Sequence, residues 1–137
     1  MTDMRVRFST LWVFAVFNYL YADILTLMDP EILRQLTTGR VGSLQMTQGL
    51  LLGAAILIET AIAMVLLSRV LHYRANRWAN MVIGALHTVA VALSLVIGGG
   101  TPAPYYLLIA VIEIACTSLI IWYAWRWKPD AALATGS

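Results

Sequence analysis

The sequence predicts an all-α fold, a polytopic membrane bundle of four helices. Of its 137 residues, 61% are hydrophobic and only 12% are charged. An average soluble domain is about 45–50% apolar and about 25% charged, and a chain this short cannot bury so large an apolar surface. Four apolar segments are each long enough to cross the hydrocarbon core as a helix. Soluble enzymes, nucleic-acid-binding domains and disordered regulators are therefore poor interpretations.

The four expected spans end at helix-breaking or charged residues. The first ends before Asp29 and Pro30, the second at a basic stretch beginning with His72, the third before Gly98 and the fourth at Arg126. Proline and glycine interrupt helices, and charged side chains mark the membrane surface. The expected organisation is a single domain over 1–129 with spans at about 9–28, 47–71, 79–97 and 105–125, followed by a flexible tail, 130–137.

The segment between the first two spans is the only long connection, and it predicts a short helix near the membrane surface. Asp29 is a suitable N-cap, Pro30 fits the first helical turn, and Gly39 is a suitable end. The other connections are short, so consecutive spans are expected to be antiparallel neighbours.

Lysine and arginine are unevenly distributed between the two expected sides of the membrane. Of the nine basic residues, only Arg34 and Arg40 lie in the long connection, and the others flank the opposite ends of the spans. The positive-inside rule therefore places both termini and the middle loop in the cytoplasm. In that loop, Arg74 and Arg77 are expected to contact lipid headgroups.

Each expected span carries one stripe of small and polar residues at helical spacing. Polar groups in a membrane usually face the interior of a bundle, because exposing them to lipid is costly. The ionisable members of these stripes are Asp23, Glu59, His87 and Glu113, and the last three lie near the middle of their spans. A charge at the bilayer centre costs about 2.5–3.5 kcal/mol, so these groups are expected to be partners of one another.

These ionisable residues suggest a proton- or cation-binding site. Glu113 is expected to bind the proton or cation and Glu59 to share its proton, because two carboxyl groups in a dry core cannot both ionise cheaply. His87 and Asn18 are expected to orient them. The alternative is that Glu59, His87 and Glu113 form a neutral, hydrogen-bonded core cluster without a function of its own.

Asp23 and Tyr21 are expected to form the outward access to this site, unless Asp23 simply reaches Thr26 or the headgroups. No metal site is expected, because the paired Glu-x-x-His spacing of di-iron carboxylate bundles is absent. No cofactor motif or catalytic residue is identified either. The full set of expected ligand- or proton-binding residues is Glu113, Glu59, His87, Asn18, Asp23, Tyr21 and Gln48.

Several segments resemble a known family. They are Phe17 to Ile24, Thr47 to Gly49, Asn76 to Asn80, Glu113 to Thr117 and Trp122 to Trp127. Over about 11–127, the chain is similar to an uncharacterised bacterial four-helix membrane family, described only as a domain of unknown function. More distantly, it resembles the DoxX-like superfamily in its four helices and the carboxylate in its second span.

The resemblance implies a four-helix fold in a bacterial cytoplasmic (inner) membrane, but it implies no activity. Relatives carry a Tyr-Thr pair at the position of His87 and Thr88, and they lack an acid at Glu59. The resemblance therefore implies that the safer site candidates are Asp23, Gln48, Arg77 and Glu113.

The leading interpretation is a small membrane protein with a midplane carboxylate site that binds a small or amphipathic ligand or relays protons in transport. Four helices alone enclose only a narrow path, so transport predicts a homo-oligomer. One alternative is an accessory subunit of a larger membrane complex, respiratory if the DoxX-like resemblance holds. Another is a lipid- or quinone-binding enzyme, which is disfavoured because no nucleophile with an adjacent base is evident. Membrane lipid is an expected partner, and nucleic acid is not.

Overall fold

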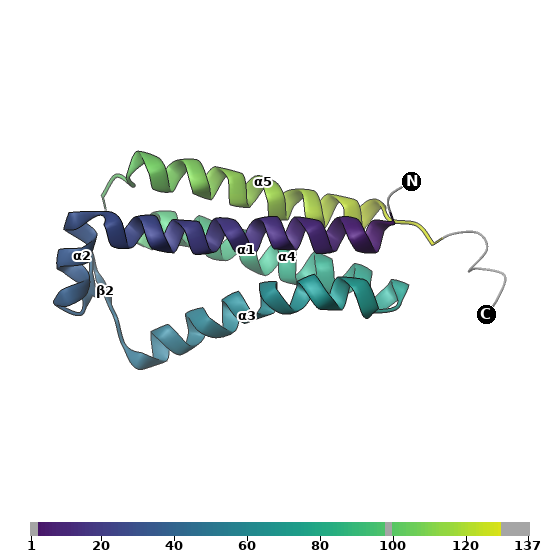
Figure 1. Cartoon of the computed structure of the whole chain (residues 1–137), viewed down its shortest axis with the longest axis horizontal. Coiled ribbons are helices and arrows are strands. Elements are labelled where there is room, and N and C mark those ends of the chain that lie inside the picture. Colours follow the sequence, from purple (N-terminus) through teal and green to yellow (C-terminus); the bar gives the residue numbers. More distant parts are fainter. Residues whose placement is uncertain (1–2, 98–99, 130–137) are drawn as a thin grey trace.

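The computed structural model describes residues 3–97 and 100–129, and long helices dominate this part of the chain (Figure 1). The expected tail, 130–137, lies outside the described residues. Four helices are long and apolar enough to cross a membrane, which confirms the all-α prediction with four candidate spans. They are α1 (Met4–Met28), α3 (Gln48–Val70), α4 (Tyr73–Ile97) and α5 (Pro104–Arg126).

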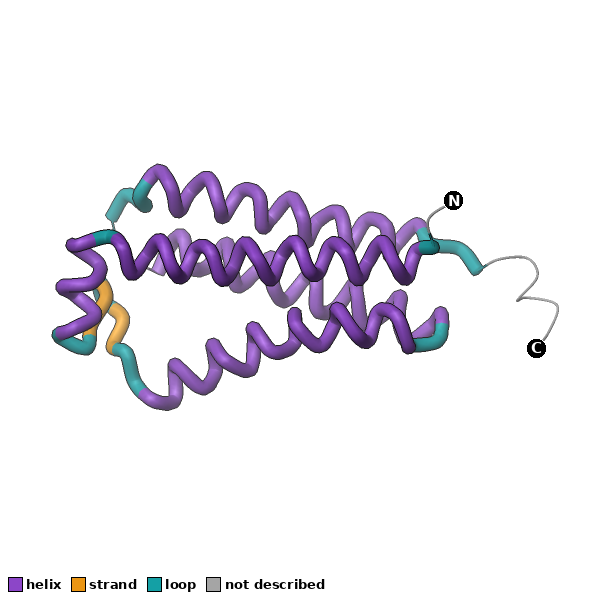
Figure 2. The backbone as a smooth tube through the Cα atoms, in the orientation of Figure 1, coloured by secondary structure: helices purple, strands orange, loops and turns teal. Residues whose placement is uncertain are grey.

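The long connection folds into the short helix α2 (Pro30–Thr37), as predicted, and a small hairpin that was not predicted. Asp29 caps α2 by accepting a hydrogen bond from the Glu31 backbone N–H (3.1 Å). The hairpin pairs β1 (Arg40–Val41) with β2 (Leu44–Gln45), and Figure 2 shows it between α2 and α3. Strands of two residues are too short to produce a detectable alternating pattern, so they could not be predicted.

Two helices extend beyond the apolar stretches that mark the expected spans. α1 begins at Met4, where the Asp3 side chain accepts a hydrogen bond from the Arg5 backbone N–H (3.0 Å). α4 begins at Tyr73, within the basic stretch. An apolar stretch reports only the part of a helix in hydrocarbon, whereas backbone hydrogen bonding continues the helix into the polar surface region.

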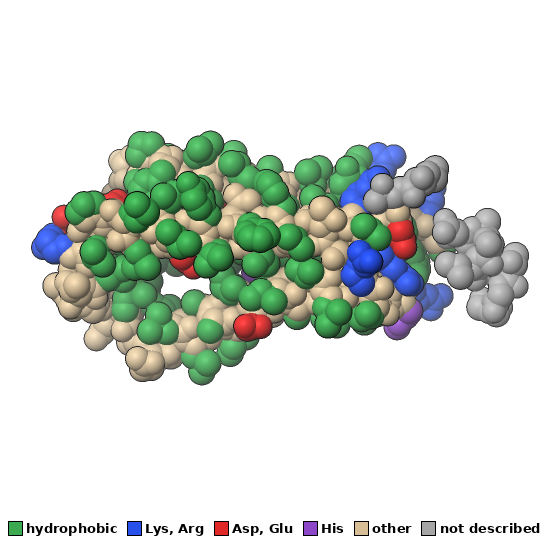
Figure 3. Space-filling model, in the orientation of Figure 1, with side chains coloured by type: hydrophobic (Ala, Val, Ile, Leu, Met, Phe, Trp, Pro, Cys, Tyr) green, Lys and Arg blue, Asp and Glu red, His purple; other side chains and the backbone are tan. Residues whose placement is uncertain are grey.

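The tightest packing lies at the end of the molecule where α1 begins and α5 ends. This basic end carries most of the Lys and Arg side chains visible in Figure 3. The side chains of Phe8, Trp12 and Ile120 are fully buried here. The buried side chains of α3 are Ala61, Met64 and Ser68, whereas toward Gln48 the helix diverges from α1 (Figure 1). The opposite half of the molecule is therefore more open.

A buried amide network joins three helices at the basic end. The Trp12 indole N–H donates to Asn80 Oδ1 (2.8 Å), and the Asn80 amide donates to Asn76 Oδ1 (2.7 Å). The Asn76 amide in turn donates to the Ser68 carbonyl (2.7 Å). Because all of these groups are shielded from water and lipid, each depends on the others for its hydrogen bonds.

Gly84 lets α4 approach α5 closely. A Cβ atom at this position would lie 2.9 Å from Ile121 Cγ1 and 3.5 Å from the Thr117 carbonyl oxygen. We expect Gly84→Leu to destabilise the protein by about 1–3 kcal/mol, because it overpacks this contact. The matched control is Gly53→Leu, since a Cβ at Gly53 would meet nothing within 4 Å. Unfolding in mixed detergent micelles measures the stability of both variants. Equal losses of stability would show that Gly84 is not needed for the close approach of α4 to α5.

Candidate functional site

All four long helices line one partly open cavity of about 140 Å³. Its lining combines polar or ionisable side chains with small or apolar ones, and none of the lining residues is Lys or Arg. Figure 3 shows that the surface is also hollowed between α1 and α3, away from the basic end. The polar or ionisable side chains that line the cavity are Tyr19, Asp23, His87, Ser94, Tyr106 and Glu113.

Glu113 is the buried acid of this cavity. Its side chain lies near the middle of α5, and the residue is only 5% exposed. Within the described part of the chain, Glu113 Oε1 is buried without a hydrogen-bond partner. An unpaired buried polar atom costs about 1–3 kcal/mol, so natural proteins rarely keep one without a water, ion or ligand to satisfy it. Glu113 is therefore the strongest candidate for a binding residue.

His87 is held between two neighbouring helices by a directed chain of hydrogen bonds. Thr60 Oγ1 donates to the Leu57 carbonyl (2.6 Å), so it can only accept from His87 Nε2 at 3.0 Å. His87 Nδ1 lies 3.0 Å from the Tyr19 hydroxyl, and in the neutral tautomer that donates from Nε2 it accepts from this hydroxyl. This pattern satisfies both ring nitrogens of a neutral imidazole without Glu113. His87 is thus part of the cavity wall through its bonds to Tyr19 and Thr60, rather than through a bond to Glu59 or Glu113.

The other polar side chains lie along the same cavity. The Tyr106 hydroxyl donates to Ser94 Oγ (2.8 Å), which donates to the Val91 carbonyl (2.7 Å). Asp23 also lines the cavity, but its side chain is exposed rather than buried. The cavity therefore has a buried acid, Glu113, and a second acid at an exposed position.

The structure separates Glu59 from the acid with which it was expected to share a proton. Glu59 is exposed and does not line the cavity, whereas the next residue, Thr60, contacts His87. Successive residues of a helix differ by about 100° in direction, so Thr60 and Glu59 point to different surroundings. The expected pairing of Glu59 with Glu113 is therefore corrected.

Three further residues of the expected set do not line the cavity. Asn18 donates to the Phe14 carbonyl of its own helix (2.9 Å), so it does not orient the carboxyl groups. Tyr21 is 57% exposed, and Gln48 is exposed at the beginning of α3. Of the seven expected residues, the cavity thus brings together Asp23, His87 and Glu113.

The two arginines expected at lipid headgroups differ in their surroundings. Arg77 Nε donates to the Ala124 carbonyl (2.9 Å) and Arg77 Nη2 to the Trp125 carbonyl (3.0 Å). It therefore satisfies carbonyl groups in the last turn of α5, which lack partners within the helix. Arg74 is exposed.

The family comparison matches nearly the whole chain. A model described as a family of unknown function (DUF6326) matches residues 2–135. The chain belongs to this family. Comparisons with curated proteins and with solved structures gave no match. Membership of the DUF6326 family agrees with the resemblance to an uncharacterised family and assigns no activity.

In this DUF6326 chain, Tyr19 and Thr60 are the partners of His87 that sequence reasoning missed, and Tyr19 also lines the cavity. Both bind His87, yet neither was distinguished from its neighbour, Asn18 or Glu59. A Tyr and a Thr at membrane depth, each able to reach a buried imidazole, were the available signal. Among the described residues of this family member, no group of three His, Cys, Asp or Glu side chains could hold a metal ion.

Proposed function

We propose that this protein binds a small cation or a proton at Glu113 inside the membrane, and that the two compete for the same carboxylate. The observation that carries the proposal is the buried Glu113 Oε1, which lacks a hydrogen-bond partner in the described part of the chain. A buried carboxyl group without a cationic partner is less costly as the neutral acid. A cation that enters the cavity supplies the missing charge and releases the proton.

The cavity wall favours a compact organic cation. It offers a second acid, Asp23, and the aromatic ring of Tyr19, but neither Lys nor Arg. Aromatic faces attract cations, most strongly where water is excluded. A volume of about 140 Å³ corresponds to roughly five water molecules, so the ligand has few heavy atoms. Tetramethylammonium is a suitable probe of this chemistry.

The proposed setting is a bacterial cytoplasmic membrane, with both termini in the cytoplasm. Four helices of sufficient length and apolar character support a membrane location. The uneven distribution of Lys and Arg supports the orientation, because the basic end would face the cytoplasm. Exchange of a cation for a proton at a midplane carboxylate is then the elementary step of proton-coupled transport.

Calorimetric titration of the full chain with tetramethylammonium tests the binding proposal. We expect the apparent affinity to rise by up to about tenfold per pH unit while protonated Glu113 predominates, because the cation competes with its proton. The experiment is performed in detergent micelles at several pH values. Absence of binding, or an affinity independent of pH, would refute the proposal.

The exposed face of α3 supports the proposal of a homo-oligomer. Glu59 lies on this face with Gln48, Ala55 and Ala63, all exposed and related by helical steps of seven, four and four. A carboxyl group facing lipid near the bilayer centre costs about 2.5–3.5 kcal/mol on insertion scales. A second copy, related by twofold symmetry, would cover it: the two Glu59 side chains would meet, and the alanines would permit close approach.

An accessory subunit is the second candidate, because another membrane protein would also cover Glu59. Single-molecule photobleaching in liposomes counts the copies of the purified chain, and this count distinguishes a homo-oligomer from an accessory subunit. A dimer that Ala63→Trp disrupts supports the homo-oligomer. A monomer at all protein-to-lipid ratios would overturn it and favour the accessory subunit, including the DoxX-like interpretation.

A further inference from the structure

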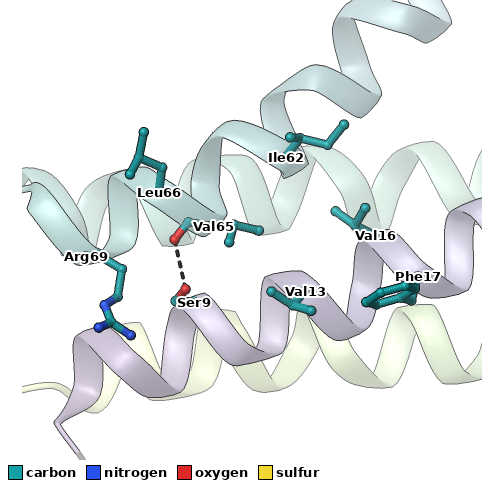
Figure 4. A pocket seen from close by; sticks show the side chains of 8 residues that line it. All are labelled: Ser9, Val13, Val16, Phe17, Ile62, Val65, Leu66 and Arg69. Carbon is teal, nitrogen blue, oxygen red and sulfur yellow. Dashed lines mark hydrogen bonds between the residues drawn. The ribbon is translucent and has the colours of Figure 1, made fainter.

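A groove runs along the outer surface between α1 and α3 (Figure 4), and it shares no lining residue with the Glu113 cavity. It has a volume of about 450 Å³ and is lined by residues of α1 from Ser9 to Phe17 and of α3 from Ile62 to Arg69. Ser9 Oγ donates to the Val65 carbonyl (2.8 Å), so the polar atoms of this bond already have partners. The lining between that bond and Phe17 is apolar.

Arg69 is the charged group of this groove. Figure 4 shows it beyond Ser9, at the opposite end of the groove from Phe17. Arg69 is exposed, lies in the last turn of α3, and has no ion pair within the described part of the chain. No carboxylate is among the residues that line the groove.

The length of the groove corresponds to one leaflet of a bilayer. Eight residue steps of helix, from Ser9 to Phe17, span about 12 Å, and half of the hydrocarbon core is about 15 Å thick. With Arg69 at headgroup depth, the Phe17 end of the groove would lie near the bilayer centre. The apolar wall of the groove is long enough for a lipid acyl chain, and the charge of Arg69 at its surface end is complementary to a lipid phosphate.

We propose that this groove binds one anionic phospholipid, with an acyl chain along the apolar wall and the phosphate on Arg69. A guanidinium group matches phosphate oxygens with two parallel hydrogen bonds. Its positive charge favours an anionic lipid over a zwitterionic one, because no acid on the groove wall offsets that charge.

Native mass spectrometry of the full chain tests the headgroup contact. The protein is titrated in detergent with phosphatidylglycerol and phosphatidylcholine that carry the same acyl chains. We expect about fivefold stronger retention of phosphatidylglycerol, and we expect Arg69→Gln to remove this preference. Arg74→Gln, at an exposed arginine outside the groove, is expected to keep it. Equal retention of both lipids, or equal losses in the two variants, would overturn the proposal.

A second variant tests the acyl-chain contact without changing charge. Val13→Trp places a large ring in the groove, and Val82→Trp places the same ring on an exposed part of α4. Val13→Trp is expected to lower retention of phosphatidylglycerol to the level of Arg69→Gln, and Val82→Trp is expected to have no effect. Unchanged retention of phosphatidylglycerol by Val13→Trp would show that the acyl chain does not lie in the groove.

Discussion

Replacing Glu113 with glutamine is expected to abolish pH-dependent binding of tetramethylammonium. Glutamine keeps the size of the side chain, but it can neither carry the negative charge nor exchange a proton. Losing one partner of a buried charge pair costs about 2–5 kcal/mol, so the affinity should fall at least about 30-fold. Calorimetric titration at several pH values measures both the affinity and its pH dependence.

The matched control is Glu31→Gln, the same substitution in α2 and outside the cavity. Glu31 forms an exposed ion pair with Arg34 (2.7 Å), and hydrogen bonds from Arg34 and Gln35 lower the pKa of its carboxyl group. The Glu31→Gln substitution is expected to leave binding of tetramethylammonium unchanged. If Glu113→Gln bound the cation as tightly as Glu31→Gln, with the same pH dependence, Glu113 would be a structural residue only.

Replacing Asn80 with leucine is expected to cause the largest loss of stability. Asn80 accepts from the Trp12 indole N–H (2.8 Å) and donates to Asn76 Oδ1 (2.7 Å), and all three residues are fully buried. Leucine would leave a donor and an acceptor unpaired, at a cost of about 1–3 kcal/mol each. We therefore expect the free energy of unfolding to fall by about 2–5 kcal/mol, measured by detergent-induced unfolding.

Asn18→Leu provides the comparison for this substitution. Asn18 is only partly buried and bonds to the Phe14 carbonyl of its own helix (2.9 Å). Its replacement leaves no buried donor unpaired, and we expect a change of less than about 1 kcal/mol. If both variants lost equal stability, the amide network would not be what ties α1, α3 and α4 together.

The sequence predicted the long helices well because membrane insertion imposes strong requirements on length and composition. A span needs about 20 mostly apolar residues, and this requirement leaves few alternatives in a chain that is 61% hydrophobic. The stripes of α1, α4 and α5 were also informative, since Asp23, His87 and Glu113 line the same cavity.

The rotation of α3 could not be predicted in the same way. Its exposed face carries Ala55, Glu59 and Ala63, and its buried face carries Ala61 and Ser68, so small residues occur on both. In water, an apolar stripe identifies the buried face of a helix, but in lipid both faces are apolar and that signal disappears. Glu59 was assigned to the interior only because exposing a carboxyl group to lipid costs free energy. A neighbouring chain that covers Glu59 would remove the same cost.

Exchange of a cation for a proton at Glu113 is best tested by counting the protons that are released when the cation binds. The full chain is equilibrated in weakly buffered detergent solution near neutral pH, and tetramethylammonium is added while a pH indicator records released protons. We expect up to one proton to be released per bound cation by the unmodified protein and none by Glu113→Gln. Cation binding without proton release at every pH tested, or proton release that persists in Glu113→Gln, would show that Glu113 is not the exchange site.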